Sequence, residues 1–188
     1  RFDIFDALVI HRVGTLQRQA SSSRFREARS TLADLHPLYR GLARYKGRTW
    51  GFFDDGDVWA LYYRKDIFGN AKLRRAYKAK YKRDLRVPRG WEEFNQVAQF
   101  ITDQMAPDVY GAAHFRKAGS PGNQFDFAQQ FRANGGQFFD DAMKAQLASD
   151  AGVRTLENML AANAASIPGN DEFDAVAVWV AWLQGKVA

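Results

Sequence analysis

The sequence contains no cysteine, which excludes disulfide bonds and thiolate metal sites but leaves an oxidising compartment permitted. It also has no long apolar run. The longest, residues 175–183, is far shorter than the ~20 residues that a membrane-spanning helix needs. No signal peptide is recognisable at the N-terminus. These absences predict a globular chain that is soluble as given.

The chain has a moderate net positive charge. Its length permits one domain or two small ones. Lys and Arg number 27 against 21 Asp and Glu, a formal charge of +6 over 188 residues. The basic residues fall in short groups, at 24–29 and 74–89, without a nucleic-acid-binding motif. We therefore interpret them as a solvated surface and predict no nucleic-acid partner.

Apolar spacing and turn residues predict an alternation of strands and helices. We expect strands at residues 2–10, 49–53, 58–63, 110–113 and 137–139. We expect helices at 35–42, from a cap at Asp66 to Tyr81, from Trp91 onward, and at 125–131. The helix from Trp91 has an apolar face at Phe94, Val97, Ala98 and Ile101, and Asn134-Gly135-Gly136 stops the helix at 125–131. Two further helices are marked by Val153, Leu156 and Leu160, and by Phe173, Val176, Ala177 and Val180. Residues 11–31 show no clear periodicity. The alternation predicts an α/β fold.

The most informative stretch is residues 51–66, in which three acids and a tryptophan precede an aromatic-rich apolar segment. Carboxylates accept hydrogen bonds from hydroxyl groups, and an indole face covers the apolar face of a pyranose ring. The stretch therefore has the residue types of a sugar-binding surface.

Several motifs resemble those of bacterial extracellular solute-binding proteins of carbohydrate ABC importers. The strand that crosses between the two lobes of that family ends in Tyr-Tyr-x-Lys-Asp, and this chain has Tyr62-Tyr63-Arg64-Lys65-Asp66. The family's Thr-Trp-Asp-Glu-Phe helix start is similar to Gly90-Trp91-Glu92-Glu93-Phe94, and its glycine pair to Gly135-Gly136. Residues 179–187 look like the segment that leads the family's chain back to its first lobe.

The resemblance implies a two-lobed periplasmic-binding-protein type II fold. Residues 1–57 would be a partial first lobe, 58–66 the lobe-crossing hinge strand, and 67–188 the second lobe without its returning strands. The implied protein is a periplasmic monomer that captures a sugar or polyol and delivers it to the membrane permease of an ATP-driven importer. No enzymatic activity, cofactor or metal is implied.

In the first lobe, the family commonly has a ligand-facing acid where this sequence has Asp57. Asp55 could share the ligand, and Trp59 lies on the same side as Asp57 under strand alternation. Alternatively, the acids only cap a turn, and Trp59 belongs to the core.

In the second lobe, the resemblance implies ligand contacts from the segment before the glycine pair, at Asn123, Gln124 and Phe125, and from His114 at a strand end. The alternatives are a helix cap for Asn123, a packed anchor for Phe125 and a satisfied strand-end position for His114. Arg116 and Lys117 are either solvated or face the cleft, where they would favour an acidic or phosphorylated sugar.

Two other functions remain open from the sequence, a glycoside hydrolase and a carbohydrate-binding module. Hydrolysis of a glycosidic bond needs two carboxylates about 5 to 9 Å apart. Asp54, Asp55 and Asp57 lie too close in sequence to flank one bond unless a distant acid such as Asp126 joins them. No phosphate-binding loop, zinc motif or nucleophile elbow is present.

Overall fold

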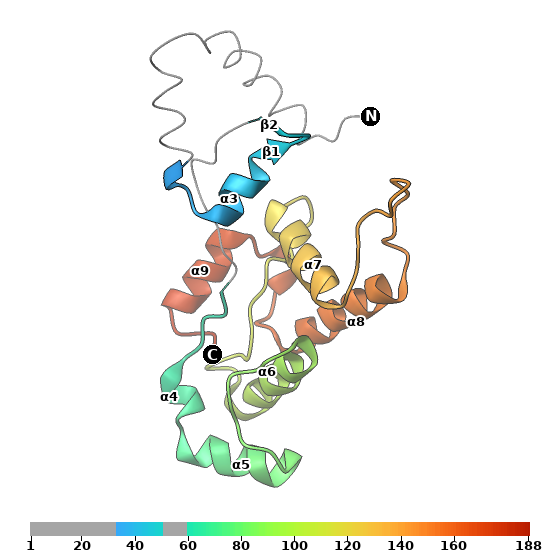
Figure 1. Ribbon diagram of the computed structural model, residues 1–188. Coiled ribbons are helices and arrows are strands. Elements are labelled where there is room, and N and C mark those ends of the chain that lie inside the picture. The colour runs from blue at the N-terminus through green and yellow to red at the C-terminus, as the bar shows by residue number, and fades with distance from the viewer. Residues whose placement is uncertain (1–32, 51–59) are drawn as a thin grey trace. The chain divides into compact units, whose positions relative to one another are not determined.

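The computed structural model describes residues 33–50 and 60–188 (Figure 1). The chain divides into two compact units, Arg1–Leu61 and Tyr62–Ala188. The division falls within the segment 58–66 in which we expected the crossing between lobes. The role of that segment as a hinge stays a prediction. Within the described ranges, no helix is both long and apolar enough to span a bilayer.

The described part of the first unit contains one short helix and one hairpin. Helix α3, Pro37–Leu42, begins with proline, whose fixed φ suits the first helical position. Strands β1, Arg44–Tyr45, and β2, Arg48–Thr49, pair antiparallel. Lys46 and Gly47 both have positive φ, which is typical of the two-residue turn that joins such strands. The helix expected at 35–42 is confirmed. The strand expected at 49–53 is described only at Thr49, which lies in β2, and at Trp50, which lies in no strand.

The second unit begins with two helices where one was predicted. Residues 60–64 are in neither helix nor strand, so the strand expected at 58–63 is absent from its described part. Helix α4 spans Lys65–Phe68 and α5 spans Ala71–Tyr81. Asp66 does not cap the longer helix: Asn70 does, because its Oδ1 accepts hydrogen bonds from the backbone N–H groups of Lys72 and Leu73. The first helix thus ends at its C-cap, Gly69, and Asn70 caps the start of the second.

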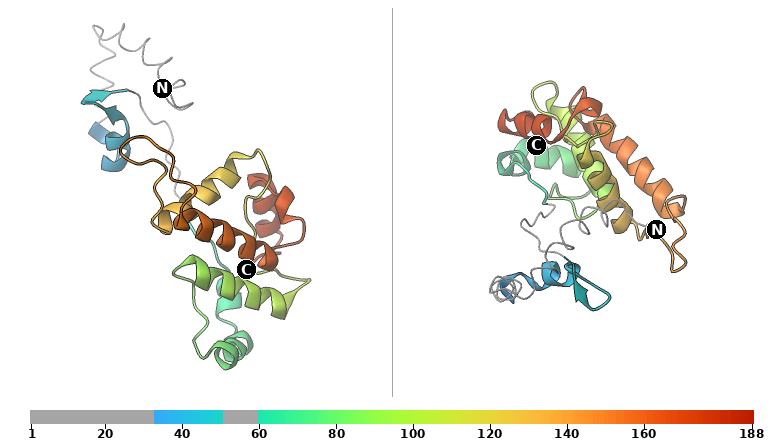
Figure 2. Two further views of the ribbon diagram at one scale, coloured as in Figure 1. Left: turned by 90° about the vertical axis from the view of Figure 1, so that its right-hand side faces the viewer. Right: turned by 90° about the horizontal axis from the view of Figure 1, so that it is seen from above.

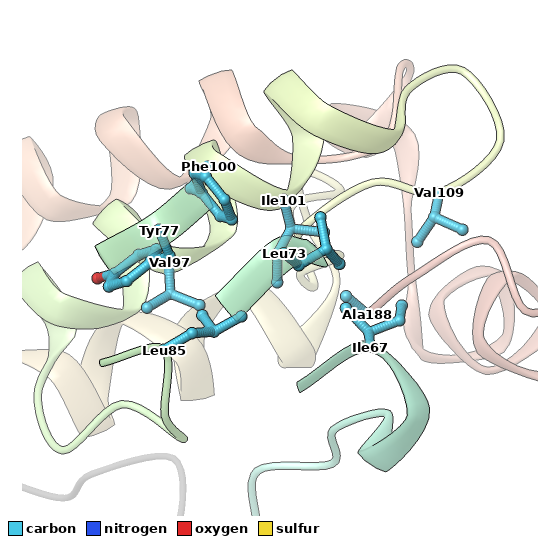
Figure 3. Packing of buried hydrophobic residues seen from close by; sticks show 9 residues of the cluster. All are labelled: Ile67, Leu73, Tyr77, Leu85, Val97, Phe100, Ile101, Val109 and Ala188. Carbon is cyan, nitrogen blue, oxygen red and sulfur yellow. The ribbon is translucent and has the colours of Figure 1, made fainter. Parts of the chain in front are cut away.

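Helix α6, Trp91–Met105, supplies the centre of the core. Its start at Trp91 is confirmed, and the expected apolar face is buried at Val97, Ala98 and Ile101. Figure 3 shows the cluster that this face forms with α4, α5 and the chain end: Ile67, Leu73, Tyr77, Leu85, Val97, Phe100, Ile101, Val109 and Ala188. Phe94 packs instead on a second cluster of Ala98, Ala112 and Ala165.

The predicted α/β architecture is only partly present, because the described part of unit 2 is mostly helical. The strand expected at 110–113 is reduced to two isolated parallel bridges, Tyr110 with Val187 and Ala112 with Ser166. The backbone hydrogen bonds are nevertheless those of parallel strands: Tyr110 N–H donates to Lys186, Ala188 N–H to Tyr110, and Ile167 N–H to Ala112. Three segments therefore run parallel, connected through helices, but each is too short to form a ladder.

Thr102 fixes this arrangement on α6. Its hydroxyl donates to the carbonyl of Ala165 and accepts from the N–H of Gly111, each at 2.7 Å. A Cβ on Gly111 would overlap the backbone of Ala98. The chain at Gly111 therefore passes directly against α6, which only glycine permits.

The remaining helices are α7, Pro121–Ala133; α8, Asp150–Ala165; the 3-10 helix η1, Asn170–Glu172; and α9, Ala175–Leu183. Helix α7 ends at Asn134 before Gly135, which has φ +81°, as expected for the Asn-Gly-Gly stop. The strand expected at 137–139 is one antiparallel bridge, Phe139 with Ala145.

The helix expected from Val153, Leu156 and Leu160 is confirmed as α8, but these three residues are 55%, 54% and 71% exposed and do not face the core. The helix packs on α6 and α7 (Figure 2). Its buried residues are small: Ala151, Gly152, Thr155, Ala162 and Ala165. Small side chains allow the helix axes to approach closely, so the larger apolar residues are left outside. Helix α9 behaves similarly at Val176 and Val180, which are also exposed.

Candidate functional site

A buried polar cluster lies where the segment after Ala112 meets helix α7. Five of its members are buried and the sixth, Asn163 on α8, is exposed but hydrogen-bonded to Arg116. The six residues are His114, Arg116, Asp126, Gln130, Asn163 and Asn170. We refer to these six residues as the polar cluster. Polar groups inside a protein are costly unless they are paired, so their contacts define what the site can do.

The centre of the polar cluster is an ion pair between Arg116 and Asp126, whose side chains are 6% and 3% exposed. Arg116 Nε also donates to Asn163 Oδ1 of α8 at 3.1 Å. The other carboxylate oxygen of Asp126 accepts from the side-chain amides of Gln129 and Gln130, at 3.2 and 3.1 Å. This pairing ties α7 and α8 to the segment that follows residue 112.

His114 lies beside the ion pair. Its Nδ1 is 3.6 Å from Asp126 Oδ2, too far for a hydrogen bond, and its ring meets that of Phe94 edge to face at 5.4 Å. Its backbone N–H donates to Asn170 Oδ1 at 2.8 Å. His114 is therefore an inward-facing residue held by its backbone and by packing.

Burial controls the ionisation of both basic residues. Burial, together with the smaller effect of the positive charge of Arg116, lowers the pKa of His114 to about 3. Burial also lowers the pKa of Arg116, to about 10, while the Asp126 carboxylate beside it favours the charged form. At neutral pH the histidine is neutral and the arginine is charged.

Four buried atoms of the polar cluster have no hydrogen-bond partner in the part of the chain that is described. They are His114 Nε2, Arg116 Nη2, Gln130 Oε1 and Asn170 Nδ2. The cluster therefore has unused donors and an unused acceptor beside a neutralised ion pair. It contains one carboxylate only, and no group of three or more metal-ligating side chains occurs among the described residues.

The predicted ligand residues of the second lobe lie just above the polar cluster, on the first turns of α7. Asn123 is half-buried, whereas Gln124 is exposed and Phe125 is 50% exposed. The cap of α7 is Ser120, whose side chain accepts from Gly122 N–H, so Asn123 does not have the capping role. Successive helical residues point about 100° apart, so Asn123 and Phe125 project to nearly opposite sides.

The structure does not bring His114 to the same surface as these three residues, because its side chain is buried beneath the helix. Asp55, Asp57 and Trp59 lie outside the described residues. The ligand-binding role of all seven residues stays a prediction.

Sequence reasoning missed the burial of Arg116, which we expected to be solvated or to face the cleft. It also missed Asn163 as the partner of Arg116 and Asn170 as the partner of the His114 backbone. One local signal was available: Asp126 and Gln130 are four residues apart on a helix, so they share a face with Phe127 and Phe131 nearby. A carboxylate on an apolar helix face requires a cationic partner.

The chain matches no protein-family model and no curated protein. Among solved structures it is similar to the crystal structure of an ABC transporter solute-binding protein from Agrobacterium radiobacter K84 in complex with ribitol. The two are 25% identical, with a TM-score of 0.49, and the match covers 61% of this chain and 28% of that chain. The chain thus spans little more than a quarter of the length of that protein.

Proposed function

We propose that this chain is part of a periplasmic solute-binding protein that captures a sugar or polyol between two lobes and delivers it to the permease of an ATP-driven importer. The observation that carries the proposal is a coincidence of position. The boundary between the two compact units, at Leu61 and Tyr62, lies inside the sequence that resembles the lobe-crossing strand. A lobe-crossing segment must lie at such a boundary.

The first-lobe side would contribute Asp55, Asp57 and Trp59. The two carboxylates accept hydrogen bonds from ligand hydroxyls, and the indole covers an apolar face of the ligand. These residues immediately precede the boundary in sequence, so closure of the lobes would carry them toward a ligand held by the second unit.

The second-lobe side would contribute the first turns of α7. Gln124 and Phe125 are exposed there, and they offer an amide and an aromatic ring, the residue types that recognise a polyhydroxylated ligand. The Arg116–Asp126 pair supports the proposal, since it anchors the inner face of the same helix. A fixed helix presents its outer side chains without a further entropic cost for ordering the backbone on binding.

Binding without catalysis is favoured over glycoside hydrolysis. Asp126, the distant acid that a hydrolytic site would need, is buried and neutralised by Arg116. A general acid or a nucleophile must reach the glycosidic bond, and a carboxylate held in this pair does not. The proposal therefore assigns Asp126 a structural role.

A thermal-shift and calorimetry screen of the chain against monosaccharides, oligosaccharides and polyols tests the proposal. We expect at least one class to bind. Asp57→Ala should then weaken binding by about 1 to 3 kcal/mol, because ligand hydroxyls lose their acceptor. The double variant Asn123→Ala with Phe125→Ala should also weaken binding, and both variants should suppress the ligand-induced compaction measured by small-angle X-ray scattering.

Matched controls lie elsewhere on the surface of the second unit. Asp108 and Phe139 are exposed, so Asp108→Ala and Phe139→Ala should bind as the parent chain does. Absence of binding to every member of the panel would reject the proposed function. Normal binding and compaction by the α7 double variant would remove α7 from the ligand site.

A further inference from the structure

The net positive charge of the chain is concentrated in helix α5 and the segment that follows it. Residues 72–89 contain nine of the 27 Lys and Arg residues and one of the 21 Asp and Glu residues. This segment therefore carries a formal charge of +8, and the other residues together carry −2. Figure 1 shows α5 at one end of the second unit.

The structure separates the two faces of α5 sharply. Leu73 and Tyr77 are buried in the core cluster of Figure 3. The exposed side chains of α5 are two alanines, Ala71 and Ala79, and five cations: Lys72, Arg74, Arg75, Lys78 and Lys80. The apolar face is thus buried in the core, and positive charge is the only charge on the exposed part of the helix.

Some of these cations form salt bridges and others do not. Lys78 pairs with Asp84 at 3.0 Å and Lys80 pairs with Asp103 at 3.3 Å. By contrast, Lys72, Arg74 and Arg75 form no salt bridge and no side-chain hydrogen bond with any described residue. We refer to these three residues as the unpaired cations of α5.

The unpaired cations also occupy an unfavourable position in the helix. They lie in the first turns of α5, where the helix dipole is positive and no acidic residue compensates it. In addition, Arg74 precedes Lys78 by four residues, a spacing at which like charges repel. Local stability therefore gives no reason for these three cations, and their charge is available to an external anionic partner.

We propose that the outer face of α5 binds the surface of an anionic lipid bilayer. The two aromatic residues of α5 face the core: Tyr77 is buried there and Tyr81 packs against it. The outer face therefore lacks the exposed rings on which single-stranded nucleic acids stack. Long, flexible cations need charge in a partner rather than a complementary shape, and a layer of anionic headgroups supplies it. Since the apolar side of α5 is buried, contact is peripheral and does not involve insertion.

This inference stands apart from the proposed solute site, because α5 contributes none of the predicted ligand residues. Failure of one proposal therefore leaves the other intact.

Co-sedimentation with lipid vesicles tests the inference. The chain should bind vesicles of phosphatidylcholine mixed with phosphatidylglycerol, bind pure phosphatidylcholine far more weakly, and dissociate as salt is raised. The triple variant Lys72→Gln, Arg74→Gln, Arg75→Gln should lower the partition coefficient about 100-fold, at about five-fold for each cation near the surface. Its melting temperature should be unchanged or higher, because repulsion at the helix start is removed.

A control variant removes the same charge from other parts of the second unit. Lys144, Arg154 and Lys186 are exposed, and their substitution by Gln should change vesicle binding far less. An equal loss of vesicle binding in the two triple variants would show that binding depends only on net charge, and it would overturn the proposal. Equal binding to both vesicle types would also overturn it, as would preferential binding to duplex DNA in a competition with anionic vesicles.

Discussion

Arg116 and Asp126 form an ion pair whose two side chains are almost fully buried, at 6% and 3% exposure. Arg116 comes from the segment after Ala112 and Asp126 from α7, so the pair joins two elements that local sequence signals describe separately. Around it lie a neutral histidine and four atoms without a hydrogen-bond partner among the described residues. Breaking such a pair is costly because one charge is left alone in a medium of low polarity.

Replacement of one partner should reveal this cost. Asp126→Asn keeps the shape of the side chain but leaves the Arg116 guanidinium without a counter-charge, and we expect it to lower the free energy of unfolding by about 3 to 5 kcal/mol. Urea denaturation measures the change. Asp141→Asn alters an exposed acid outside the helices and should have an effect of about 0.5 kcal/mol or less. An Asp126→Asn variant as stable as this control would show that the pair contributes little.

The buried His114 should make stability depend on pH. Its pKa falls from 6.5 to about 3 on folding, so between these values the unfolded chain binds more protons. Stability is therefore fully present above about pH 6.5 and is lost as the pH falls, by up to about 1.4 kcal/mol for each pH unit.

His114→Gln should remove this contribution while it keeps the backbone hydrogen bond to Asn170. Urea melts from pH 7 to pH 4 should give a shallower dependence in the variant, with a difference of about one proton. The comparison with the parent chain cancels the contributions of ionisable groups that both chains share. Identical slopes would contradict the neutral, buried state of His114.

Thr102 is expected to be essential for the contact between α6 and the parallel segments. Thr102→Val preserves shape but leaves the N–H of the buried Gly111 and the carbonyl of the fully buried Ala165 without their partner. We expect a loss of about 2 to 4 kcal/mol by thermal or urea denaturation, the sum for two buried polar groups left unpaired. Thr102→Ser retains the hydroxyl and should lose much less. Equal losses in the two variants would assign the effect to the methyl group.

Asn70 and Asp66 give a direct test of where the second unit restarts its helix. Asn70→Ala removes the acceptor for two backbone N–H groups of α5 and should cost about 1 kcal/mol. Asn70→Ser, which keeps a capping oxygen, should cost a few tenths of this value. Asp66→Ala should leave α5 intact, since the exposed Asp66 pairs with Arg64 and bonds no backbone group of α5. A larger loss of stability for Asp66→Ala than for Asn70→Ala would show that Asp66 caps the helix, as the sequence predicted.

The sequence determined the parts of this protein that depend on neighbours along the chain. The start of α6 at Trp91, its apolar face at Val97, Ala98 and Ile101, and the end of α7 at Asn134 were all predicted. Each follows from spacing or from a conformational preference that acts within about one helical turn.

Tertiary structure decided where side chains of ambiguous character lie. Leu156 and Leu160 gave an apolar periodicity, yet α8 turns its small residues inward, because close packing on α6 and α7 depends on the shape of those helices. The segment at 110–113 formed bridges rather than a strand, because pairing requires partners that come from 166–167 and 186–188. Arg116 was buried rather than solvated because Asp126 and Asn163 meet it there, and a charge enters the interior only where distant residues supply its partners.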